Sequence, residues 1–146
     1  MLRLLTSVDI APCGDFLTSR DRVLVLGSCF ADSIGQRLLE SGFDVLVNPF
    51  GTLYNPASLL SALERIAGGE HFTEADCVQM GAGAGLVCSY SHHTSFARPE
   101  VSGFLDNANR ALDEAAEFWR GCTRLIVTLG TAWCYRSVET GRIVSN

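Results

Sequence analysis

Three short and mostly apolar runs in the chain predict buried β-strands. They are Arg22–Gly27, Asp44–Val47 and Arg124–Leu129, and a glycine closes the first and the last of them. Each run carries apolar residues on both faces, which is typical of parallel strands that helices cover on both sides. The sequence therefore predicts three strands of one parallel sheet.

Apolar residues at spacings of three and four predict three helices. These are expected over residues 31–41, 56–68 and 101–120. The second has the clearest ends, because Asn55 can cap it, Pro56 suits its first position and Gly69 can end it. Residues 70–99 lack such periodicity and are expected to be irregular, whereas residues 133–146 are expected to form a hairpin.

Strands that alternate with helices predict right-handed βαβ units and an α/β fold. If the first strand lies between the other two, as in the flavodoxin-like order, its carboxyl end is the point where ligands bind. Residues 27–29, 48–51 and 130–131 would then converge there. Doubly wound sheets usually carry about five strands, so the domain is expected to continue beyond Asn146.

Length and composition narrow the function classes. The 146 residues suit one domain, and a net charge of −5 argues against a binder of nucleic acid or of anionic membranes. All 11 cations are arginines, which excludes lysine-based Schiff-base chemistry. The six cysteines form no CxxC pair, and the first residues contain no signal-peptide core. These features favour a soluble cytoplasmic protein with reduced thiols.

Ser28 and Cys29 follow the first strand and are therefore candidate nucleophiles. Backbone N–H groups at the start of the following helix could stabilise an oxyanion beside them. Each residue also has a purely structural interpretation. Serine is a favoured helix N-cap, and a cysteine is often a small buried apolar residue.

Four blocks of sequence resemble the GSCFA family in the order that the family has them. They are Gly27–Ala31, Asn48–Pro56, His92–Phe96 and Leu129–Trp133. The resemblance runs from about residue 20 onward and implies a single GSCFA-type domain over residues 1–146, with a family pattern that continues past residue 146. That family in turn resembles the SGNH (GDSL-type) hydrolases, which are flavodoxin-like serine esterases with helices on both sides of a parallel sheet.

The resemblance implies roles for several residues. Ser28 is expected to be the nucleophile, with Cys29 as the alternative, and Gly51 and Thr131 are expected in the oxyanion hole. Ala132 stands where SGNH-type enzymes have an asparagine, so another residue, such as Asn48 or Asn55, would have to supply that donor. SGNH-type enzymes place the histidine base in a later block, which this chain does not contain.

The function implied is a serine hydrolase or acyltransferase that acts on an ester, either an O-acyl carbohydrate or a small metabolite, and that has little activity without the later block. No cofactor is implied. The alternative is a non-catalytic module that binds a ligand or a partner. Because three strands leave a sheet edge uncovered, a homodimer or a complementary chain is also expected.

Three polar residues are candidates for substrate contact: Asn55, His92 and His93. Either histidine could also form a nominal triad with Ser28 and Asp32. The cysteines and histidines of residues 77–93 match no zinc-ligand spacing, so no metal is expected. The glycine-rich run at residues 81–85 is expected to be a flexible turn rather than a dinucleotide loop.

Overall fold

A three-stranded parallel sheet forms the centre of one half of the molecule. The computed structural model describes residues 8–12, 14, 16–81 and 85–145. Its sheet has the order β2-β1-β5, with β1 (Arg22–Gly27) between β2 (Asp44–Val47) and β5 (Arg124–Thr128). Val25 lies opposite Val47 on one side and Ile126 on the other. The strands, their parallel direction and their flavodoxin-like order confirm the α/β fold that the sequence predicts.

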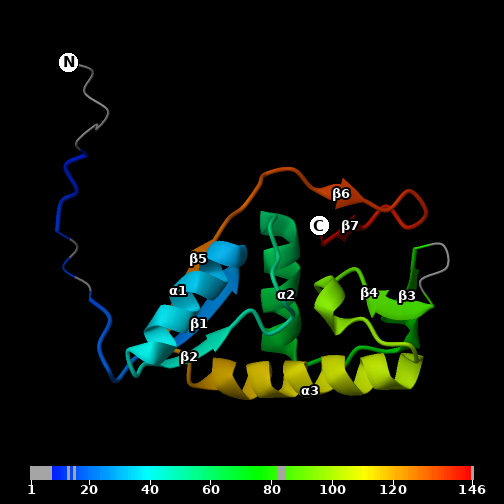
Figure 1. Cartoon of the computed structure of the whole chain (residues 1–146), viewed down its shortest axis with the longest axis horizontal. Helices are drawn as coiled ribbons and strands as arrows, with labels where there is room; N and C mark the ends of the chain where they lie inside the picture. Colours follow the sequence, from blue (N-terminus) through cyan, green and yellow to red (C-terminus); the bar gives the residue numbers. More distant parts are fainter. Residues whose placement is uncertain (1–7, 13, 15, 82–84, 146) are drawn as a thin grey trace.

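Helices cover the two faces of this sheet unequally. On one face, Val23 and Val25 pack with Ala31 of α1 (Cys29–Glu40) in a small cluster. On the other face, Leu24 and Leu26 join a larger core that contains residues of α2 (Pro56–Gly68) and α3 (Val101–Arg120). In Figure 1, α3 runs from the region of β3 and β4 to the sheet, so the larger core extends well beyond the strands.

Residues 70–99 are more regular than their missing periodicity predicts. They contain an antiparallel hairpin, β3 (Cys77–Met80) with β4 (Leu86–Ser89), and two short 3₁₀ helices, η1 (Glu74–Asp76) and η2 (Thr94–Phe96). Val87 and Cys88 of β4 are buried in the larger core. Contacts with this core, rather than local sequence, account for the hairpin, so the expectation of an irregular segment is wrong.

The expected tail hairpin is present as β6 (Tyr135–Arg136) and β7 (Ile143–Val144). It lies beside the loop that follows β4 (Figure 1), where the Ser145 N–H donates to the Tyr90 carbonyl at 2.8 Å. Across the described part of the chain, no helix combines the length and the apolar character needed to cross a bilayer.

Candidate functional site

The turn between β1 and α1 brings Ser28 against the end of β5. The Ser28 N–H donates to both the carbonyl oxygen and the Oγ1 of Thr128, each at 3.2 Å. Gly27 has a φ of +141°, and a Cβ placed on it would lie 2.0 Å from the Thr128 carbonyl oxygen. Only glycine permits this approach, so Gly27 sets the position of Ser28.

The Ser28 hydroxyl is engaged, whereas the Cys29 thiol is exposed. Ser28 Oγ accepts from the Phe30 N–H at 3.4 Å and lies 3.2 Å from Thr128 Oγ1, which makes Ser28 the N-cap of α1. Its exposed fraction is 7%. Cys29 is the first residue of α1 and is exposed to solvent. Access from solvent therefore favours Cys29 as the nucleophile, whereas direct contact with the end of β5 favours Ser28 in that role.

The segments that follow the three strands meet around this turn, as the sequence predicts. The Leu53 N–H donates to the Gly27 carbonyl at 2.9 Å. The N–H groups of Gly130 and Thr131 both donate to the Tyr54 carbonyl, at 3.0 and 3.1 Å. A Cβ placed on Gly130 would lie 3.4 Å from Ser28 Cβ. Three loops that are far apart in the sequence therefore lie together at the carboxyl ends of the strands.

The two residues expected in an oxyanion hole already use their N–H groups. The Gly51 N–H donates to the Asn48 carbonyl at 2.7 Å, and the Thr131 N–H to the Tyr54 carbonyl. To bind an oxyanion, each group would have to share its hydrogen with a second acceptor. Their role stays a prediction.

Asn48 joins the ends of β1 and β2, and sequence reasoning missed this function. Its Oδ1 accepts from the Gly27 N–H at 2.8 Å, and its Nδ2 donates to Asp32 Oδ1 at 2.6 Å. It has a φ of +41°, and it is the sole residue other than glycine with a positive φ in the described ranges. Asparagine tolerates this conformation better than most residues, and its place directly after β2 is the signal in the sequence.

A pocket of about 430 Å³ lies between α1 and the loop that follows β2. We call it the polar pocket; it is lined by Asp32, Gln36, Leu39, Val47, Asn48, Gly51, Thr52, His93 and Ser95. A second hollow of about 310 Å³ follows β5 and is lined by Pro56 and residues 129–132. We call it the β5-side pocket. Neither pocket is lined by Ser28 or Cys29 themselves. Their turn is flanked by a lining residue of each, since Asn48 of the polar pocket accepts from the Gly27 N–H and Gly130 of the β5-side pocket lies against Ser28.

His93 belongs to the polar pocket. Its Nδ1 accepts from the Ser95 N–H at 3.2 Å and lies 3.0 Å from Ser95 Oγ, which makes His93 the N-cap of η2. The His93 N–H donates to the Phe50 carbonyl at 2.9 Å, so this loop is tied to the segment after β2. The structure thus places His93 on a wall of the pocket, as a substrate-contact role requires, and the role itself stays a prediction.

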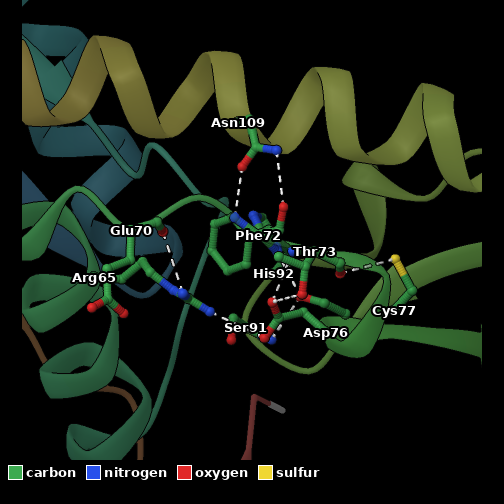
Figure 2. Close-up of polar contacts among 10 residues, drawn as sticks. Arg65, Glu70, Phe72, Thr73, Asp76, Cys77, Ser91, His92 and Asn109 are labelled. Atoms are coloured by element: carbon green, nitrogen blue, oxygen red, sulfur yellow. Dashed lines mark hydrogen bonds and ion pairs between the residues drawn. The ribbon is translucent and has the colours of Figure 1, made fainter.

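His92, by contrast, is buried in the larger core. It is 3% exposed and lies among aromatic rings, with centroid distances of 4.6 Å to Phe72 and 5.0 Å to Phe50. Its Nδ1 is 2.7 Å from Ser89 Oγ, and its Nε2 has no hydrogen-bond partner in the described parts of the chain. Figure 2 shows His92 beneath Phe72, near the ion pair of Arg65 with Asp76.

Burial and, to a smaller extent, the nearby charge of Arg65 lower the pKa of His92 from 6.5 to about 4, while Asp76 opposes the shift. The ring is therefore neutral at pH 7. Because it is enclosed, His92 has almost no surface with which to touch a substrate in this conformation. Asn55 is also fully buried, and its Oδ1 accepts from the Ser58 N–H at 2.8 Å as the N-cap of α2. Neither residue lines the polar pocket.

A comparison with protein families shows to which family the chain belongs. Residues 22–146 match the model of the GSCFA family. The chain belongs to the GSCFA family. The match covers β1, the Ser28–Cys29 turn and both pockets, so the whole candidate site lies within the GSCFA region. No curated protein and no solved structure is similar enough to the chain to count as a match.

Two residues of this GSCFA domain that could have suggested a zinc site, Cys88 and His92, are buried in the larger core. His92 is enclosed by aromatic rings, and burial raises the pKa of the Cys88 thiol, which opposes the thiolate that a metal requires. Within the described residues, no group of three or more histidine, cysteine, aspartate or glutamate side chains is arranged to hold a metal ion.

Proposed function

We propose that the chain is an acyl hydrolase or acyltransferase of the SGNH type, which acts on an ester through a nucleophile in the Ser28–Cys29 turn. One observation carries the proposal: the turn lies at the carboxyl end of the central parallel strand, flanked by a lining residue of each of two pockets. Catalytic residues of open α/β sheets are expected at that point, where the strand order reverses. A pocket on each side gives an ester room for both of its halves.

In the proposed reaction, Ser28 Oγ attacks the ester carbonyl, the ester C–O bond breaks, and the alcohol leaves with the serine proton. The residue that accepts this proton is not assigned, because Ser28 Oγ has Thr128 Oγ1 rather than a histidine beside it. The start of α1 supports the proposal, since N–H groups of a first helical turn favour a developing negative charge.

The exposure of Cys29 favours a second candidate, in which its thiolate is the nucleophile and the acyl group is carried as a thioester. Ser28 would then act as the N-cap that orients the turn. The two candidates predict different acylated atoms and can therefore be separated directly.

The test is to trap an acyl-enzyme with p-nitrophenyl acetate and to locate the acetyl group by peptide mass spectrometry. Trypsin releases residues 23–37 as one peptide, and fragmentation distinguishes Ser28 from Cys29. Because Ser28 Oγ has no histidine beside it, we expect labelling to be slow and use long incubation. We expect labelling of wild type and of Ser33→Ala, whose serine lies on the first turns of α1, but not of Ser28→Ala. Labelling that is lost in Cys29→Ala instead would establish the thiol candidate. If neither residue is acylated, the enzyme proposal is overturned, and the non-catalytic alternative takes its place.

A further inference from the structure

The polar pocket offers many uncharged hydrogen-bonding groups and one carboxylate. Gln36, Thr52 and Ser95 supply an amide and two hydroxyls, and Asp32 is the one carboxylate among the residues that line it. None of the described residues that line it is an arginine. An anionic ligand such as a phosphate would meet the negative charge of Asp32 with no cation to offset it.

One carboxylate oxygen of Asp32 can still accept a hydrogen bond from a ligand. Its Oδ1 accepts from Asn48 Nδ2 at 2.6 Å, which fixes the carboxylate against the wall. Its Oδ2 has no hydrogen-bond partner among the described residues, and the side chain is exposed. A carboxylate oxygen accepts only, so this atom would select a ligand that donates.

His93 supplies the complementary donor. The Ser95 N–H can only donate, so Nδ1 of His93 must accept, and the neutral ring carries its hydrogen on Nε2. Nε2 makes no hydrogen bond with the described part of the chain. The pocket therefore holds an acceptor on α1 and a donor on the loop before η2.

We propose that the polar pocket binds a polyhydroxylated group, namely a carbohydrate or another polyol. A hydroxyl both donates and accepts, so neighbouring hydroxyls can satisfy Asp32 and His93 together. Leu39 and Val47 add apolar surface for the C–H face of a sugar ring. A hydrocarbon chain would leave the polar groups of the pocket unsatisfied, which disfavours an acyl group there.

The position of the pocket relative to the nucleophile extends the proposal, and this step rests on the proposed function. Asp32 lies one helical turn beyond Ser28, and Asn48 contacts both Asp32 and the Gly27 N–H. When the polyol half of an ester is bound in the polar pocket, the ester carbonyl lies toward the Ser28–Cys29 turn. The acyl group then extends toward the β5-side pocket, where Leu129 and Pro56 offer apolar surface.

A direct binding experiment tests the ligand class without requiring turnover. The imidazole NMR signals of His93 are followed while methyl glucoside, methyl galactoside, myo-inositol or cyclohexanol is added, each up to about 100 mM, which is enough to reveal a millimolar Kd. We expect at least one polyol to shift the His93 signals in a saturable way and cyclohexanol to leave them unchanged. No saturable shift with any polyol, or an equal response to cyclohexanol, would overturn the proposal.

Two conservative variants test the assigned atoms. Asp32→Asn keeps an acceptor for Asn48 but loses the charge, and His93→Asn keeps an N-cap acceptor for the Ser95 N–H but loses the Nε2 donor. We expect each to weaken polyol binding about tenfold, as loss of one hydrogen bond to a charged or buried group does. Asp113→Asn, at an exposed ion pair with His71, is the control and should bind as wild type does. Equal weakening in all three variants would contradict the assignment.

The polyol-binding test and the acyl-enzyme test can each fail without the other, so the two proposals are tested separately. Polyol binding with no acyl-enzyme supports the pocket and overturns the proposed function. An acyl-enzyme with p-nitrophenyl acetate but no polyol binding supports the proposed function and overturns the pocket. If both succeed, the ratio of the reaction rate of acetylated methyl glucoside to that of p-nitrophenyl acetate should be higher for wild type than for Asp32→Asn.

Discussion

Gly51, like Gly27, combines a positive φ with close packing at the candidate site. It has a φ of +80°, and a Cβ placed on it would lie 2.4 Å from His93 Cβ. We expect Gly51→Ala to lower the free energy of unfolding by about 3 kcal/mol, of which about 1 kcal/mol comes from the left-handed backbone and the rest from the clash. Urea denaturation measures this loss.

The control for this substitution is Gly141→Ala. Gly141 has a φ of +67° and no atom within 4 Å of a Cβ placed on it, so only the conformational cost of about 1 kcal/mol is expected. Equal losses in the two variants would show that the contact between Gly51 and His93 does not constrain the loop.

His92 makes stability depend on pH. Because its pKa falls from 6.5 to about 4 in the folded protein, the unfolded chain takes up a proton at a higher pH than the folded chain does. Its contribution to stability is therefore complete above pH 7 and is lost as the pH falls from about 6.5 to 4. This loss amounts to about 3 kcal/mol, since one pKa unit corresponds to about 1.4 kcal/mol.

The variant His92→Phe tests this contribution, because a phenyl ring suits the aromatic surroundings and cannot be protonated. We expect its unfolding free energy to vary less with pH between 4 and 7 than that of wild type. His71→Asn, at an exposed histidine, should retain the wild-type dependence. If the free energy of unfolding of His92→Phe depended on pH as that of wild type does, protonation of His92 would not be the cause of this dependence.

Individual residues of the site were predictable only where the fold itself places them. Gly27 ends a strand of the parallel sheet, and Ser28 and Thr131 follow strands of it. Their meeting could therefore be predicted from strand order alone. The burial of His92 could not, because it depends on rings that come from residues as distant as Phe50 and Phe104. The link from Asp32 through Asn48 to Gly27 likewise depends on side-chain positions across two loops.

At the scale of the element, Asn55 acts on α2 as a whole. Its Oδ1 accepts from the Ser58 N–H and its Nδ2 donates to Ser58 Oγ at 2.9 Å, all in a buried position. We expect Asn55→Ala to lower the free energy of unfolding by about 2 kcal/mol, near the upper end for an N-cap, and Asn55→Asp to lose less. Thermal unfolding of the two variants measures this. If Asn55→Ala retained full stability but lost substrate binding, the role expected from the sequence would be restored.

The elements themselves were largely predictable, and the exceptions have a physical cause. The three helices and the three parallel strands have strong periodicity or continuous apolar runs, and they form where the sequence predicts them within about two residues. β3 and β4 have four residues each, with neither a clear alternating pattern nor an apolar run along the whole strand. Their pairing is stabilised by the core beneath β4, so it could not be inferred from local sequence.

At the scale of the whole molecule, β5 is an edge strand with an uncovered face. Among the described residues it pairs only with β1, and the exposed fractions of Leu125 and Val127 are 41% and 43%. Leu129 and Trp133, which follow the strand in the sequence, are also exposed apolar residues, with exposed fractions of 62% and 84%. Unpaired edges and exposed apolar side chains both favour association with another chain.

We therefore expect the chain to self-associate through β5, with a second copy as the partner. Light scattering after size exclusion should give a mass above that of the monomer, and Val127→Glu should return it to the monomer, because a charge on an edge strand opposes strand addition. Val138→Glu is the control, since Val138 is fully exposed in the turn of the β6–β7 hairpin, away from the sheet. Thermal unfolding establishes that Val127→Glu remains folded. A wild-type monomer at every concentration would overturn the expectation, and association that persists in Val127→Glu would place the interface on another surface.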